Sequence, residues 1–97
     1  MIIPKSFVMA GNRWRVKLRK KMDTYGLCDF ASHTIYIAEY VDGRPTSDED
    51  RFKTLLHEAL HALEFTMGKD ADEEFVSAAE QLIFQAMRTA RGNHNEI

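Results

Sequence analysis

The chain has 97 residues, enough for one domain with a single hydrophobic core, so residues 1–97 are expected to form a single domain. Its net charge of −2 gives no general attraction to nucleic acid or to an anionic membrane, and neither is expected as a partner. No apolar stretch approaches the roughly 20 residues that span a bilayer, and residues 1–10, with too short an apolar stretch, are not expected to act as a secretory signal. A single cysteine, Cys28, offers no disulfide, so a cytoplasmic protein is expected.

The first half of the chain has the pattern of a small sheet. Residues 7–10 form a short apolar run, and Gly11-Asn12 suits the turn of a two-residue hairpin. Residues 13–19 then alternate strictly between polar and apolar side chains, which is typical of a half-buried strand. The side chains expected to face the core are Trp14, Val16 and Leu18.

The opposite face of this strand is basic. It carries Arg13, Arg15, Lys17 and Arg19, and Lys20 and Lys21 follow directly. Such a face could contact phosphate or an acidic substrate, but a solvated outer face of a sheet explains it as well. We expect a solvated face, and nucleic-acid binding is the weaker alternative.

Two further strands are predicted before the first helix. Residues 27–30 and 34–38 are expected to pair as a hairpin, with Ile35 and Ile37 pointing inward, and Pro45 closes the sheet region. Together with the earlier strands they predict an antiparallel sheet of about four strands.

Residues 47–67 are predicted to form a helix. Thr46 is the expected N-cap, with Glu49 three residues later, and Gly68 supplies the stop. Apolar residues recur at steps of three and four, as on a helix face that packs against a core. They are Phe52, Leu56, Ala59, Leu60, Leu63 and Met67.

This helix contains the motif HExxH, as His57-Glu58-Ala59-Leu60-His61. Positions i and i+4 lie one turn apart on one helix face, so His57 and His61 can bind a single metal ion. Glu58 is placed to handle a water molecule at that metal. Metal binding explains this pattern better than two polar histidines beside the core.

A second helix is expected after the two-residue turn Gly68-Lys69. It begins with Asp70 as its N-cap and extends to Gly92, and residues 93–97 form a frayed tail. The short turn predicts that the two long helices lie antiparallel. The expected fold class is therefore α+β, with the sheet packed on this helix pair.

A catalytic zinc takes three protein ligands and leaves a fourth position for water, so the two histidines need a partner. His33 and His94 are the remaining histidines, and neither has a spacing that recommends it. The candidates on the second helix are Asp72, Glu73, Glu74 and Glu80.

The chain resembles the gluzincin group of metallopeptidases, in particular the minigluzincins and the short metallopeptidase-like proteins of phages and prophages. The segments that carry the resemblance are Tyr25-Gly26-Leu27-Cys28-Asp29, Ile35-Tyr36-Ile37, Thr54-Leu55-Leu56-His57-Glu58-Ala59-Leu60-His61-Ala62-Leu63-Glu64 and Asp72-Glu73-Glu74-Phe75-Val76. The resemblance implies a minimal zincin-like architecture, a bound Zn²⁺ and peptidase activity. It also implies that Glu73, twelve residues after the second histidine, is the third ligand.

Two assignments stay open at this stage. Glu73 could instead complete a capping box with Asp70, and Glu74 is the next candidate for the third ligand. Larger gluzincins often carry Asp or Asn four residues after the ligand glutamate to orient a histidine, whereas Ser77 stands here. Glu64 is the other candidate for that orienting role.

The expected activity is zinc-dependent hydrolysis of a peptide or protein substrate. Glu58 would act as general base for a water molecule activated by the metal. The strand at residues 34–38 is expected to align an extended peptide at the sheet edge. Tyr36, Tyr40 and His33 are the candidates for stabilising the oxyanion, and the sequence does not separate them.

The competing interpretations retain the metal site but assign it a different role. A latent peptidase could have residues 93–97 in its cleft. A regulatory or binding module could keep the metal without turnover, and a purely structural site is a third option. Cys28 is expected to be a small buried side chain and not a ligand. The sequence specifies neither the substrate nor the oligomeric state.

Overall fold

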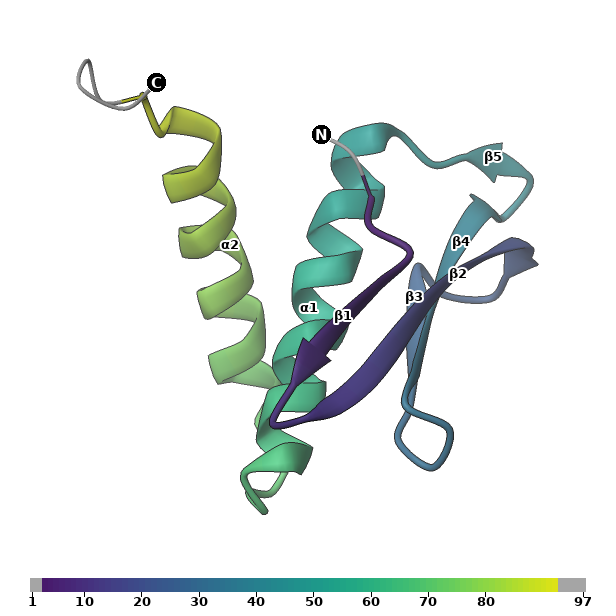
Figure 1. The fold of residues 1–97 in the computed structure, drawn as a ribbon. Helices are drawn as coiled ribbons and strands as arrows, with labels where there is room; N and C mark the ends of the chain where they lie inside the picture. Colours follow the sequence, from purple (N-terminus) through teal and green to yellow (C-terminus); the bar gives the residue numbers. More distant parts are fainter. Residues whose placement is uncertain (1–2, 93–97) are drawn as a thin grey trace.

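The computed structural model describes residues 3–92 and has the expected α+β fold, a sheet packed against two helices (Figure 1). The elements are β1 (Ser6–Met9), β2 (Asn12–Met22), β3 (Gly26–Asp29), β4 (Thr34–Val41), β5 (Arg44–Pro45), α1 (Asp48–Thr66) and α2 (Glu73–Thr89). The frayed tail predicted for residues 93–97 lies outside the described residues. Within residues 3–92, neither helix combines the length and apolar character needed to cross a membrane.

The sheet is mixed and five-stranded, whereas about four antiparallel strands were predicted. Its order is β1-β2-β4-β3, and β5 pairs with β4. The two long central strands, β2 and β4, run parallel, and the other pairs are antiparallel. Alternation along a strand predicts which side chains face the core, but it carries no information on strand direction, so this pairing could not be predicted from it.

The turns of the sheet depend on left-handed backbone conformations. Ala10 and Gly11 both have positive φ and join β1 to β2, so the hairpin turn lies one residue before the predicted Gly11-Asn12. Asp42 and Gly43 turn β4 into β5 in the same way. The predicted hairpin of residues 27–30 and 34–38 is confirmed as β3 and β4.

The core lies between the sheet and α1. Trp14, Ile35 and Ile37 are at most 1% exposed and pack against Leu55 and Ala62 of α1. Leu18, also predicted to face the core, is 47% exposed. Its part of β2 extends beyond the end of β1, which pairs only as far as Arg15, so no strand within residues 3–92 lies beside it on that side.

Helix α1 begins one residue later than predicted. Ser47 is the N-cap, and it forms a capping box with Asp50. Thr46 instead donates its hydroxyl to the carbonyl oxygen of Ala38 in β4. Gly68, with φ of 70°, follows the end of the helix as expected. The predicted apolar face is only partly buried, since Leu63 and Met67 are 37% and 58% exposed.

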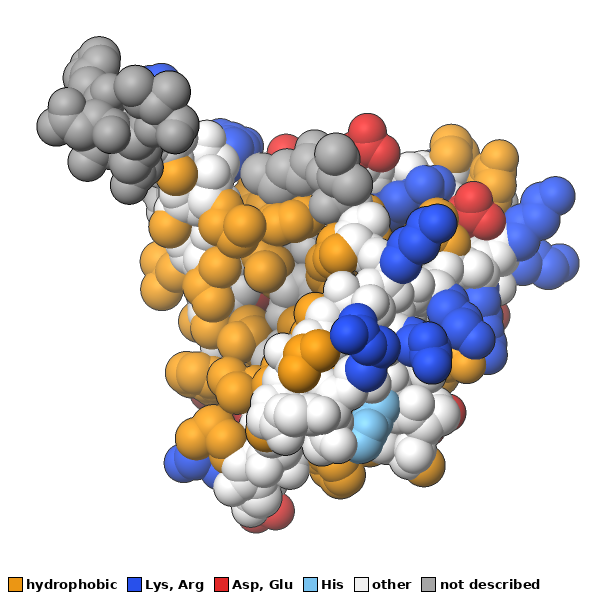
Figure 2. All heavy atoms as spheres, in the orientation of Figure 1, with side chains coloured by type: hydrophobic (Ala, Val, Ile, Leu, Met, Phe, Trp, Pro, Cys, Tyr) orange, Lys and Arg blue, Asp and Glu red, His pale blue; other side chains and the backbone are white. Residues whose placement is uncertain are grey.

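Helix α2 runs back along α1, but it begins later than predicted, after a connection that is longer than two residues (Figure 1). Its N-cap is Asp72, not Asp70, and the Asp72 carboxylate accepts a hydrogen bond from the Phe75 backbone. Only Val76 and Phe84 are buried in this helix. Its large exposed apolar side chains give the orange face of Figure 2, and they are Phe75, Leu82, Ile83 and Met87.

Candidate metal centre

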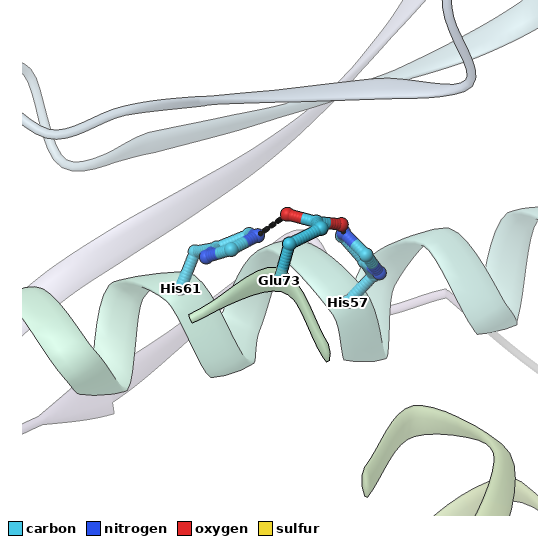
Figure 3. Close-up of side chains that lie close together, drawn as sticks. All are labelled: His57, His61 and Glu73. Carbon is cyan, nitrogen blue, oxygen red and sulfur yellow. Dashed lines mark hydrogen bonds and ion pairs between the residues drawn. The ribbon is translucent and has the colours of Figure 1, made fainter. Parts of the chain in front are cut away.

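His57 and His61 lie one helical turn apart on α1, with ring centroids 5.0 Å apart. The four-residue spacing causes this, because residues i and i+4 are neighbours on one helix face. Figure 3 shows that Glu73 approaches the two imidazoles from the start of α2 and places its carboxylate between them.

The three side chains bring their possible metal-binding atoms close together. Glu73 Oε1 lies 2.7 Å from His57 Nε2, and Glu73 Oε2 lies 2.9 Å from His61 Nε2. The ligand atoms all lie within 4.8 Å of one another, so the group could hold a metal ion. Two imidazoles and one carboxylate are a donor set that zinc takes in catalytic sites. The Glu73 side chain is 66% exposed, so the site opens to solvent on the α2 side.

The other ring nitrogen of each histidine is held by a second glutamate. His57 Nδ1 lies 3.0 Å from Glu80 Oε1, and His61 Nδ1 lies 2.9 Å from Glu64 Oε1. A carboxylate at Nδ1 fixes that atom as the proton donor and leaves the Nε2 lone pair for a metal. The two imidazoles are therefore turned toward the same point.

Glu64 has a second contact that joins the two helices. Its Oε2 accepts a hydrogen bond of 2.9 Å from the backbone N–H of Asp72, the N-cap of α2. The residue is only 7% exposed. One buried carboxylate thus orients His61 and positions the helix start that carries Glu73.

The alternatives for the third ligand occupy other places. Glu73 is the first residue of α2 after its N-cap, so the predicted capping box between Asp70 and Glu73 is absent. Asp72 caps the helix, and Glu80 stands behind His57. Glu74 is exposed and does not belong to the converging group.

The remaining sequence candidates do not reach the histidine pair. Ser77 has no side-chain hydrogen bond to either histidine in the part of the chain that the structure describes. The His33 ring packs on Trp14 at a centroid distance of 4.7 Å, next to β4 and away from the metal centre. His94 lies outside the described residues.

Glu58 lines the cleft beside the metal centre. Burial raises the pKa of its carboxyl above the ordinary value of 4.5, although His57 and His61 act in the opposite direction. Glu73 and Glu80 add to the increase in the pKa, because each negative charge disfavours another nearby. A carboxylate with a raised pKa binds a proton more readily near neutral pH, as a general base requires.

The strand beside this cleft is β3, not residues 34–38 as predicted. Strand β4 lies between β2 and β3, so its edges are already paired, whereas β3 pairs only with β4. Gly26 lets β3 approach α1 closely. A Cβ atom there would overlap Thr54 Cγ2 and lie 3.2 Å from Glu58 Cγ.

The predicted candidates for oxyanion stabilisation do not line the cleft. Tyr36 packs under the Arg19 guanidinium, and Tyr40 lies farther along the same strand. The cleft, of about 380 Å³, is lined by Thr24, Tyr25, Gly26, Asp50, Lys53, Thr54, His57, Glu58, Glu73 and Glu80. Tyr25 and Lys53 are thus the side chains that sequence reasoning missed. Lys53 lies four residues before His57 on α1, so the helical spacing could have indicated it. The position of Tyr25 depends on how β3 packs on α1, which no local pattern specifies.

Cys28 packs beside the core but is only half-buried, whereas a buried side chain was expected, and it is not in the converging group. Burial raises the pKa of its thiol to about 12, with smaller contributions from Glu58 and Asp29. A thiol with so high a pKa is protonated at neutral pH and is a poor metal ligand.

No protein-family model, curated protein or solved structure matches this chain. The resemblance to gluzincins therefore rests on the motif residues themselves, and the structure brings His57, His61 and Glu73 together with that spacing.

Proposed function

We propose that the protein is a zinc-dependent peptidase of the gluzincin kind, with Glu58 as its general base. The observation that carries the proposal is the convergence of His57, His61 and Glu73 at an open cleft. Glu58 lines the same cleft and has a raised pKa. A purely structural zinc site has four protein ligands and no need of a neighbouring base.

Each residue of the site has a separate role in the proposed reaction. Zinc, when held by His57, His61 and Glu73, supplies a Lewis acid that lowers the pKa of a water molecule toward ~7. Glu58 would accept a proton from the water molecule that attacks the peptide carbonyl carbon, and would then deliver this proton to the leaving amine. Glu64 and Glu80 hold the imidazoles in place through their Nδ1 atoms.

The free edge of β3 suits an extended peptide. Its unpaired backbone groups can form main-chain hydrogen bonds with a substrate strand, which supplies affinity with little sequence preference. Tyr25 and Lys53 stand at the rim of the cleft and would meet the substrate side chains or its carbonyl oxygen. This arrangement favours peptides over small-molecule substrates.

The proposal is tested on the zinc-loaded protein with a library of quenched fluorescent peptides. We expect hydrolysis that a chelator abolishes and that Glu58→Gln lowers by at least 100-fold, while the zinc content stays at one per chain. Glu74→Gln is the matched control, because this exposed carboxylate lies outside the site.

Metal content per chain, measured on the native protein and on Glu73→Ala, tests the ligand set separately. Zinc binding without hydrolysis of any peptide would support a binding module that keeps the metal. Hydrolysis that survives unchanged in Glu58→Gln would refute the assigned base.

A further inference from the structure

Strand β2 carries a row of cations on the face opposite the core. They are Arg13, Arg15, Lys17, Arg19 and Lys21, all exposed. Trp14 and Val16, which alternate with them, are buried under α1, so the row points away from the helices. Figure 2 shows Lys and Arg side chains gathered over the sheet, apart from the apolar face of α2.

The charges of this basic row are not neutralised locally. Within residues 3–92, the ion pairs involve other cationic side chains, and none involves the row. Residues 13–21 hold six of the 13 Lys and Arg and none of the 15 Asp and Glu, so the rest of the chain has a net charge of −8. The overall charge of −2 therefore conceals a strongly polarised molecule.

The row is also linear. Alternate residues of a strand lie about 6.7 Å apart, so the five cations extend over roughly 27 Å. A line of evenly spaced positive charges fits a chain with regularly repeated negative charges, whereas a flat anionic membrane needs a broad patch and apolar side chains that insert.

Aromatic rings stand beside the row. Tyr36 and Tyr40 of β4 pair in register with Lys17 and Lys21, and therefore lie on the same face. The Arg19 guanidinium lies 3.8 Å from the centroid of the Tyr36 ring, and Tyr40 is 40% exposed. Ala38, between the tyrosines, is fully buried and pairs in register with Arg19.

Cations that follow a backbone, next to rings on which bases stack, are the two components of sites for single-stranded nucleic acid. We propose that the basic row and its two tyrosines bind single-stranded DNA or RNA. The phosphates lie along β2, one base stacks on Tyr40, and a second stacks on the Arg19 guanidinium that covers Tyr36. This reverses the expectation from the net charge, because the charges are segregated onto one strand. It is independent of the proposed peptidase activity, since the row lies across the sheet from His57 and His61.

The test is fluorescence anisotropy of the full chain with a labelled single strand of about 15 nucleotides, as DNA and as RNA. Neutralising four to five phosphates predicts a slope of about −3 for log K against log salt, which is roughly a 60-fold loss from 50 to 200 mM salt. Affinity is expected to be equal with and without zinc, so failure of the peptidase proposal would leave this result unchanged.

Two variants test the two components. Joint substitution of Arg15, Lys17 and Arg19 by Gln should reduce the slope by about 2. The matched control substitutes Gln for the exposed cations Lys69, Arg88 and Arg91, which changes the net charge equally and should leave the slope unchanged.

Tyr40→Ala should weaken binding at least 5-fold, because one stacked base is lost. Circular dichroism of each variant confirms that it folds. The proposal is overturned by equal affinity for duplex and single strand, by an unchanged affinity in Tyr40→Ala, or by no binding at 50 mM salt. Binding to vesicles of anionic lipid in preference to the oligonucleotide would also overturn it.

Discussion

Replacing Glu64 by glutamine should weaken zinc binding while the fold is retained. Glu64 accepts two hydrogen bonds, one from His61 Nδ1 and one from the Asp72 backbone N–H, each 2.9 Å long. A glutamine of the same shape has a single acceptor oxygen and an NH₂ group that only donates. It can therefore satisfy one of these two donors but not both.

Either placement of the amide has a cost. If its oxygen faces Asp72, its NH₂ group faces His61 Nδ1, which must then accept, and the proton moves to the Nε2 atom that a metal needs. If its oxygen faces His61, the part-buried backbone N–H of Asp72 faces an NH₂ group and loses its acceptor, which costs about 1–3 kcal/mol. Zinc binding requires the second placement, so the affinity should fall roughly 5- to 150-fold.

Glu80→Gln is the informative comparison. Glu80 holds His57 Nδ1 through one oxygen, and its other oxygen has no protein partner among residues 3–92. The glutamine amide can turn freely and still accept a hydrogen bond from His57 Nδ1. The zinc affinity should therefore fall by less than about 3-fold, which is within the typical contribution of one neutral hydrogen bond. Competition with a chromophoric chelator measures both affinities. Equal losses in the two variants, or none in Glu64→Gln, would refute the role of Glu64 as a fixed double acceptor.

Three further predictions concern the cleft and strand β3 beside it. Gly26→Ala should lower the free energy of unfolding in urea by about 1–3 kcal/mol, because its Cβ overlaps Thr54 Cγ2. The loss should shrink when Thr54→Ser removes that methyl group, and an equal loss in both backgrounds would contradict the close packing. Burial raises the pKa of Glu58, so the folded state binds the proton of this carboxyl more tightly than the unfolded state. The free energy of unfolding of the metal-free protein should therefore fall as pH rises from about 4.5 through the raised pKa. Glu58→Gln should therefore melt at a higher temperature than the native protein at pH 7 without zinc, and the difference should vanish below pH 4; a constant difference at all pH values would be inconsistent with the shift. Cys28, with its pKa of about 12, should react with iodoacetamide at pH 8 far more slowly in the folded protein than in urea, and equal rates would show that the thiol is accessible and ionised.

The sequence predicted the parts of the site that depend on local spacing. His57 and His61 converge because four residues make one helical turn, and Glu73 follows on the returning helix at the distance that the motif implies. Helix ends were predicted within one to three residues, since several polar residues near each start can act as caps.

The parts that depend on distant segments could not be predicted. The parallel pairing of β2 with β4 arises from how β3 adds to the far side of β4, and alternation carries no trace of it. For the same reason, the strand at the cleft was misplaced, and Tyr25 was given no role at the site. Glu80 was considered only as a ligand, because its place behind His57 depends on how α2 packs on α1.

The sparse packing of α2 would make its position sensitive to any ion that binds at the histidine pair. Only Val76 and Phe84 of this helix are buried, and its other links to α1 include the carboxylates of Glu73 and Glu80 at the histidine pair. Any ion that binds between the helices must therefore stabilise their docked arrangement by the same free energy with which docking strengthens ion binding. Zinc concentration would then set how often α2 separates from α1, and with it how often the apolar face of α2 is accessible to other molecules.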